Sequence, residues 1–196
     1  LRALIFQLYE KNGVIKRSEI DNIVKLIPSD ERKKLWGMGI KIGRYHVYLH
    51  KMLKPKAVEF RISLWKIFHN LTNKHEIPKS GLNFVVNKNY EKNFLLLCGF
   101  EKFKDYFIRI DILEKLFIKI LDNTKDRKFK INSDMMNLLG CTKENFYKLM
   151  TYMDYKKDRV EDTYIFQGEK IKKIDKFIKF DKNENPFKKL LSLNIK

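Results

Sequence analysis

Histidine and cysteine are the residue types in this chain that could hold a metal or move protons. The four histidines are His46, His50, His69 and His75. His46 and His50 are four residues apart, a spacing that places two metal ligands on one face of a helix. The surrounding stretch instead alternates like a strand, and no HExxH motif or third ligand stands nearby. The two cysteines, Cys98 and Cys141, form no CxxC pair. We therefore expect no metal site.

The motifs of nucleotide hydrolysis are absent from the sequence. Gly37, Gly39 and Gly43 are not part of a Walker A loop, G-x4-G-K-[ST], and no DExH box occurs. No Ser/His/Asp or Cys/His arrangement favours nucleophilic catalysis. We therefore expect this chain alone to be no enzyme and to hold no cofactor.

Basic and aromatic side chains favour a different chemistry, contact with a nucleic-acid backbone. A helix expected after Thr142 presents Tyr147 and Lys148 opposite its core face, together with Glu144, Thr151 and Tyr155. The predicted nucleic-acid-binding residues are Lys148, Lys156, Lys157, Arg159, Tyr147, Arg44, His46 and Lys41. The alternative for the same surfaces is protein contact alone.

The elements that would position the C-terminal residues follow one another closely. Asp111 and Glu114 form a D-x-x-E pair typical of a helix start. Its core stripe is Leu113, Leu116, Phe117, Ile120 and Leu121. A strand over 128–131, helices capped by Ser133 and Thr142, and strands over 156–160 and 163–167 complete the series. This order is that of a winged helix-turn-helix, whose third helix and wing face nucleic acid.

The first 78 residues predict a mostly helical segment. Helices are expected over 3–10, from Ser18, over 30–38, and from Pro55 to about residue 70. The last of these should bury Val58, Ile62, Trp65 and Phe68. Residues 73–82 predict a linker, residues 83–86 and 106–110 two short strands that pair, and residues 90–98 a helix between them.

Residues 37–55 form an extended insertion with a more specific pattern. The pattern is G-x3-G-x-Y-H-x-Y-L-x3-L-K-P, from Gly39 to Pro55. It resembles a segment in the C-terminal region of a bacterial family of superfamily 2 helicases, which are similar to the RNA helicase of the mitochondrial degradosome. The resemblance continues at 111–114, at 135–141 and at 185–187, so it spans most of the chain with gaps. It implies an ATP-dependent parent helicase, whose upstream motor domains would use ATP and Mg.

Charge and composition limit the class of partner. The chain has 196 residues, 44% of them hydrophobic, and a formal net charge of +18. A core is therefore expected, and the charge favours a polyanion such as nucleic acid. Only eight of the 42 basic residues are Arg, so part of this basicity is also explained by the lysine-rich drift of an AT-rich genome.

The sequence further predicts a cytoplasmic location and no membrane contact. No apolar run reaches the length of a membrane span. Two distant cysteines fit a reducing compartment. The chain opens LRALIFQLYE, without an initiator Met or a signal peptide, which we interpret as the C-terminal part of a longer protein.

Together these observations predict an α+β chain that is mainly α with short β elements. We expect a helical segment over 1–78, a small α+β region over 79–168 that ends in a winged-helix-like module over 111–168, and a basic tail over 169–196. The predicted function is a non-catalytic accessory region of an RNA or DNA helicase that contacts the nucleic-acid backbone. The alternatives are a docking platform, for example for a nuclease partner, and a winged-helix regulator.

Overall fold

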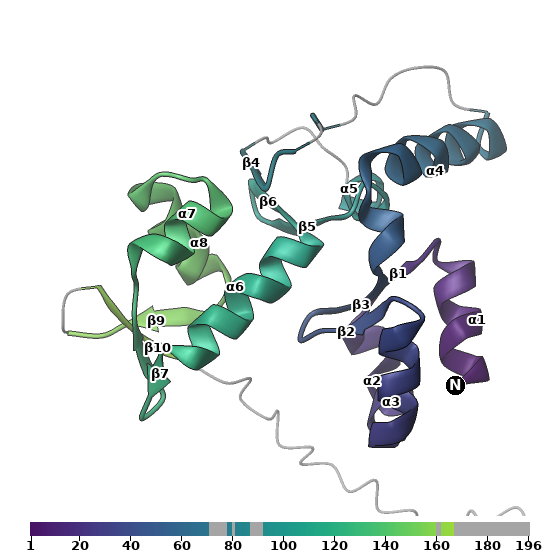
Figure 1. Cartoon of the computed structure of the whole chain (residues 1–196). Coiled ribbons are helices and arrows are strands. Elements are labelled where there is room, and N and C mark those ends of the chain that lie inside the picture. Colours follow the sequence, from purple (N-terminus) through teal and green to yellow (C-terminus); the bar gives the residue numbers. More distant parts are fainter. Residues whose placement is uncertain (71–77, 80, 87–91, 160–161, 167–196) are drawn as a thin grey trace, which may run out of the picture. The chain divides into compact units, whose positions relative to one another are not determined.

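The computed structural model describes residues 1–70, 78–79, 81–86, 92–159 and 162–166 (Figure 1). Within these ranges the chain is a mixed α+β protein with eight α-helices and three small antiparallel sheets, which confirms the expected class. Most of the predicted linker at 73–82 and the whole of the tail at 169–196 lie outside the described residues. None of the described helices is both long and apolar enough to span a bilayer.

The N-terminal elements wrap helices around a three-stranded sheet. In chain order they are α1 Arg2–Glu10, β1 Val14–Lys16, α2 Arg17–Lys25, α3 Ser29–Gly37, β2 Ile40–Ile42 and β3 His46–Leu49. The sheet order is β1-β3-β2. The predicted insertion is therefore a hairpin, and β1, which sequence reasoning missed, pairs with β3 so that Lys16 lies opposite His46.

The longest of the described helices, α4, spans Pro55–Phe68 and follows a 3-10 turn at His50–Leu53. Pro55 stands in its first turn, as predicted, where the missing N–H and the fixed φ of proline suit a helix start. Val58 and Ile62 are buried, whereas Phe68 is 82% exposed. The prediction that Phe68 belongs to the core is thus wrong, because the inward face of α4 follows residues 58, 62 and 65.

A second sheet follows in the middle of the chain. Its elements are β4 Phe84–Val86, α5 Lys92–Leu97, β5 Phe100–Phe103 and β6 Tyr106–Arg109. The predicted pairing is confirmed, since β4 runs antiparallel to β6 with Phe84 opposite Ile108. Sequence reasoning missed β5, which pairs with the other edge of β6.

The C-terminal elements form a helical core covered by a four-stranded sheet. They are α6 Ile110–Asp122, β7 Thr124–Lys125, β8 Lys128–Lys130, α7 Ser133–Leu139, α8 Lys143–Tyr152, β9 Tyr155–Lys157 and β10 Thr163–Phe166. The sheet order is β7-β8-β10-β9. Asp126 and Arg127 both have positive φ, as a two-residue hairpin turn requires.

The largest apolar cluster lies in this C-terminal part and includes Leu139, Phe146 and Leu149, as predicted. Phe117 was predicted to share it, but this ring is only half-buried and packs edge-on against Tyr45, with centroids 5.7 Å apart. Smaller clusters fill the N-terminal and middle sheets. Residues Leu1–Phe166 form one unit by their contacts.

Candidate nucleic-acid interface

The predicted residues of β9 point to opposite sides of the four-stranded sheet. Successive residues of a strand alternate between its two faces, so Lys156 and Lys157 diverge. Lys157 lies opposite Tyr164, which is buried, and Lys156 lies opposite Ile165. The two neighbours therefore belong to two different candidate surfaces.

The outer face of this sheet carries lysines on three of its four strands. Lys125 on β7 pairs with Lys128 on β8, Lys128 pairs with Ile165 on β10, and Ile165 pairs with Lys156 on β9. Lys130, two residues after Lys128, points the same way. We call the set Lys125, Lys128, Lys130 and Lys156 the lysine face; all four are exposed.

Most of this charge is not neutralised by the protein. Lys128 Nζ lies 2.8 Å from Asp158 Oδ2. In the described part of the chain, Lys125, Lys130 and Lys156 make no ion pair. Exposed ammonium groups of this kind suit phosphate contacts, which need charge more than fixed geometry.

A second basic surface, which we call the α8 face, lies where α8 meets β9 and β10. It contains the predicted Tyr147, Lys148, Lys157 and Arg159. The Nζ atoms of Lys143 and Lys157 lie 5.4 and 5.7 Å from the centroid of the Tyr147 ring. The Tyr147 hydroxyl donates a hydrogen bond to Asp162, which also binds Lys143 Nζ at 3.2 Å.

These contacts change the role predicted for Tyr147. Its ring is half-buried, and its centroid lies 6.2 Å from that of Tyr164. Its main role is therefore to position Lys143 and Lys157, and little of its ring is free to stack on a base. Tyr155 is also not on the exposed face of α8 as predicted, because the helix ends at Tyr152 and Tyr155 is a buried residue of β9.

The remaining predicted residues lie on the β2–β3 hairpin. Lys41 is half-buried, with its Nζ 4.0 Å above the centroid of the exposed Trp36 ring. Arg44 is exposed, and its guanidinium carbon lies 5.9 Å from the centroid of Phe117 on α6. Both cations lie near the surface, but each already contacts an aromatic ring, which leaves less of the cation available to a ligand.

The prediction that His46 touches nucleic acid is wrong, because its side chain is 1% exposed. His46 Nε2 lies 2.8 Å from Glu101 Oε2, and Lys16 Nζ lies 2.5 Å from the other oxygen of the same carboxylate. His46 Nδ1 lies 3.8 Å from Glu114 Oε1, too far for a hydrogen bond but close for a charge pair. We call Lys16, His46, Glu101 and Glu114 the buried charge cluster.

Glu114 does not cap its own helix, contrary to the D-x-x-E prediction. Its carboxylate accepts hydrogen bonds from the backbone N–H groups of Arg44, Tyr45 and His46, at 2.6, 2.9 and 2.9 Å. The other member of the pair, Asp111, binds the Arg109 guanidinium instead. Residues 39–55 and 111–114, which are far apart in sequence, therefore meet in space at this carboxylate.

Burial and charge act against each other in the buried charge cluster. Burial lowers the pKa of His46, but the Glu101 hydrogen bond and the two nearby carboxylates outweigh it, and the net pKa is raised above 6.5. Burial likewise raises the pKa of Glu101, but His46 and Lys16 hold it below 4.5. The protonated imidazole and the ionised carboxylate therefore stabilise each other.

The contacts of the buried charge cluster give it a structural role. Among the described residues, no group of His, Cys, Asp or Glu has an arrangement that could hold a metal ion. A side chain that is 1% exposed also offers a substrate no access in this conformation. The cluster instead joins β1, β3, β5 and α6, which come from distant parts of the chain.

Sequence reasoning missed three of the four residues of the lysine face. The alternation Lys128-Phe129-Lys130 was visible and predicts two lysines on one side of a strand. Lys125 was missed because its hairpin contains no Asn-Gly or Asp-Gly dipeptide.

The comparisons with known proteins add no relative: no family, curated protein or solved structure matches this chain.

Proposed function

We propose that this chain is a nucleic-acid-binding accessory region that holds the phosphate backbone on the lysine face. The observation that carries the proposal is the register of the four-stranded sheet, which aligns Lys125, Lys128 and Lys156 across it. Contacts of lysine with phosphate supply affinity without sequence preference. The formal charge of +18 adds a long-range attraction for the same polyanion.

The proposal includes a winged-helix identity for residues 110–166. The order α6, β8, α7, α8, β9, β10 and the strand order β8-β10-β9 support it. In such a module the third helix, here α8, and the β9–β10 connection often face nucleic acid. That geometry would favour the α8 face, but Glu144 is exposed on α8 and Asp162 neutralises Lys143 there. We therefore place the main contact on the lysine face.

The helicase context belongs to the same proposal and depends on the sequence pattern from Gly39 to Pro55. In that context the chain would guide RNA or DNA while motor domains elsewhere in the same protein use ATP and Mg. The hydrogen bonds between Glu114 and the backbone of Arg44–His46 support this context, because they explain why residues of two separate blocks of the pattern would occur together.

The test compares three variants that each lose three positive charges. The first removes the lysine face (Lys125→Ala, Lys130→Ala, Lys156→Ala), and the second removes the α8 face (Lys148→Ala, Lys157→Ala, Arg159→Ala). A third, with alanine at the exposed Lys33, Lys34 and Lys56, controls for net charge. Binding of short single-stranded RNA and DNA to the full chain is measured across a salt series.

In the lysine-face variant, the slope of log K against log salt should become less steep by about 2, since each of three lost phosphate contacts contributes roughly 0.7 for single strands. The control should change the slope much less. A larger effect from the α8-face variant would move the interface to α8, as the sequence first predicted. Equal slopes for all four proteins, or no binding at low salt, would remove nucleic acid from the function.

A further inference from the structure

The helix α4 is apolar on two sides, and only one of them is covered. Its inward side buries Val58 and Ile62. Its outward side carries Phe60, Leu64 and Ile67 at helical spacing, with 65%, 51% and 72% of each side chain exposed. A helix that is apolar all round is normally covered on all sides. The outward side of α4 is therefore unusual for a surface helix.

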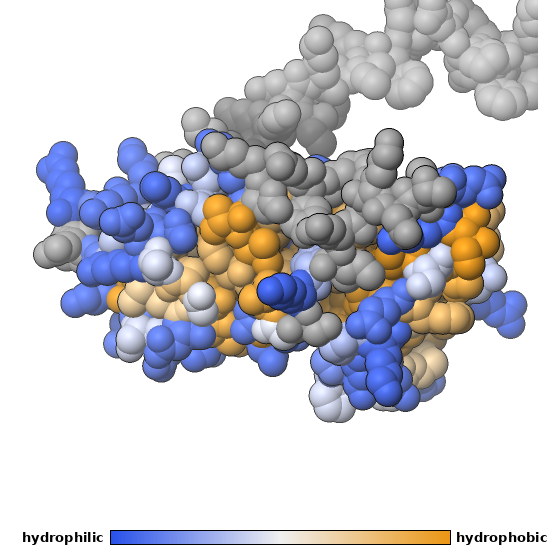
Figure 2. Space-filling model, turned by 90° about the horizontal axis from the view of Figure 1, so that it is seen from above, coloured by the Kyte–Doolittle hydropathy of each residue, from blue (hydrophilic) through white to orange (hydrophobic). Residues whose placement is uncertain are grey.

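A second helix continues the apolar surface. Ile5, Phe6 and Tyr9 of α1 are also exposed. Two hollows of about 630 and 370 Å³ lie along these helices, and both are lined by Asn12 and Met52, so they adjoin. Apolar residues reach the surface at the right of Figure 2, on the side where α4 lies in Figure 1. We call this surface, bounded by the exposed apolar residues of α1 and α4, the α1–α4 groove.

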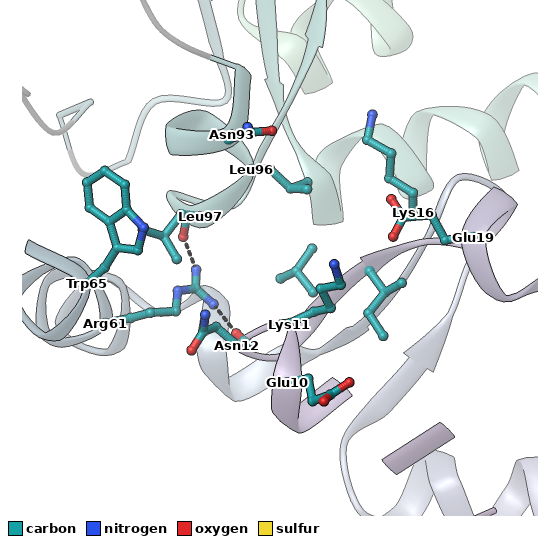
Figure 3. Close-up of a pocket in the computed structure, with 12 residues that line it drawn as sticks. Glu10, Lys11, Asn12, Lys16, Glu19, Arg61, Trp65, Asn93, Leu96 and Leu97 are labelled. Carbon is teal, nitrogen blue, oxygen red and sulfur yellow. Dashed lines mark hydrogen bonds between the residues drawn. The ribbon is translucent and has the colours of Figure 1, made fainter. Parts of the chain in front are cut away.

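Arg61 places a buried positive charge in the wall of the α1–α4 groove. Its side chain is 4% exposed, and its two terminal nitrogens donate to the carbonyls of Asn12 and Leu97 (Figure 3). Its Nε, also buried, has no hydrogen-bond partner. Burial lowers the pKa of Arg61 to about 10, which indicates a charge without a carboxylate to compensate it.

The charges around the α1–α4 groove decide what kind of partner suits it. The exposed lysines on the elements that border it are Lys11, Lys51, Lys54 and Lys56. The same elements carry only two exposed carboxylates, Glu10 and Glu59. A second copy of this chain would bring another +18 to the contact. The chain's own residues 169–196 are also basic, with nine lysines and four acidic residues. Like charges disfavour both occupants.

We propose that the α1–α4 groove binds an acidic amphipathic helix of a partner protein. Apolar side chains at positions i, i+4 and i+7 of that helix would fill the two hollows, and its carboxylates would face the exposed lysines of the bordering elements. This surface shares no residue with the lysine face, so the inference does not depend on nucleic-acid binding.

The test uses a synthetic helical peptide of about four turns, with leucines at i, i+4, i+7 and i+11 and glutamates on the other side. A matched peptide replaces every glutamate by lysine. Trp65 lines the larger hollow and reports binding by its fluorescence. The full chain carries Trp36→Phe, which removes the only other tryptophan from the signal.

The acidic peptide should shift the Trp65 emission in a saturable way, and the lysine peptide should bind about tenfold more weakly or worse. Leu64→Asp should weaken the acidic peptide at least as much. Ile118→Asp, at a similarly exposed position of α6, should leave its affinity unchanged. Rising salt should weaken the acidic peptide, because its charges lie at the rim of the contact.

Five results would overturn the proposal. The first four are equal affinities for the two peptides, no saturation by either, an equal loss from Ile118→Asp, and a dimer in solution that Leu64→Asp dissociates. The last of these four would make a second copy the occupant. Peptide binding that appears only after Ile174→Ser and Phe177→Ser would instead assign the groove to the chain's own tail, and it would equally overturn the proposal.

Discussion

The carboxylate of Glu114 occupies the space that a side chain at Gly43 would need. A Cβ built on Gly43 would lie 2.2 Å from Glu114 Cδ. That carboxylate is held by three backbone N–H groups of the residues directly after Gly43. The second glycine of the G-x3-G pattern is therefore required by a close approach between the hairpin and α6, not by a phosphate ligand.

Gly43→Ala should destabilise the fold by about 1–3 kcal/mol, because the carboxylate must move away from its three donors. Gly37→Ala is the matched control, since nothing lies within 4 Å of a Cβ at that position. Denaturant unfolding of both variants checks the prediction. An equal effect of the two substitutions would mean that Glu114 moves without cost.

Glu114→Ala should cost about 3–5 kcal/mol, because it leaves the N–H groups of residues 44–46 without their acceptor and removes one of the two carboxylates beside His46. Glu114→Gln keeps one acceptor oxygen but removes the charge beside His46. The free energy of unfolding of Glu114→Gln should therefore lie between those of the wild type and Glu114→Ala. The free energy of unfolding of the three proteins gives the order, and a Gln variant as unstable as the Ala variant would make charge the dominant contribution.

The buried charge cluster makes stability depend on pH. The raised pKa of His46 means that the folded protein holds this proton more tightly than the unfolded chain. Its contribution is complete below pH 6.5 and is lost as the pH rises through the raised folded value. The pKa of Glu101 is lowered, so its contribution is present above pH 4.5 and is lost as the pH falls through the lowered folded value.

The cluster should therefore stabilise the fold most between pH 4.5 and 6.5. In His46→Gln, the decrease in unfolding free energy above pH 6.5 should disappear, because glutamine does not titrate. Unfolding curves of both proteins across this range provide the measurement. Parallel pH profiles for the two proteins would show that His46 is not protonated in the fold.

Leu149 tests the C-terminal core, where its side chain is 0% exposed. Leu149→Ala should cost about 2–5 kcal/mol through lost burial and the cavity left behind. Leu121→Ala, at a leucine that is 53% exposed on α6, should cost far less. Thermal and denaturant unfolding compare the two, and similar losses would contradict the packing described.

Local sequence features predicted the elements whose cause is local. Pro55 begins α4, and the Thr142 side chain accepts a hydrogen bond from the Asn145 N–H at the start of α8. Gly140 ends α7 in the left-handed conformation, as glycine does at helix ends. Each of these features depends only on residues within about one helical turn, so it could be predicted from the local sequence.

Long-range contacts explain where the sequence misled. Glu114 has the spacing of a capping residue, but its acceptor atoms serve N–H groups 68 to 70 positions earlier. His46 alternates with its neighbours as an exposed strand residue would, yet Glu101 on another sheet draws it into the interior. Nothing in the local pattern distinguishes these partners, because the distance along the chain hides them.

The lysine face shows the same limit in part. The alternation in β8 predicts one pair of lysines correctly, but the full row depends on which strands become neighbours. That order places β10, the last of the described strands, between β8 and β9. Strand order is a property of the assembled sheet, and periodicity within one strand does not specify it.

The central place of β10 also determines when the four-stranded sheet can form during synthesis, because the chain leaves the ribosome from its N-terminus. Neither β8 nor β9 has its β10 partner until Thr163–Phe166 has been synthesised. The β1-β3-β2 sheet, by contrast, is complete in sequence by Leu49 and can fold earlier. The row that joins Lys156 to Lys125 and Lys128 therefore needs β10, so the contact proposed for this sheet requires synthesis to have passed residue 166.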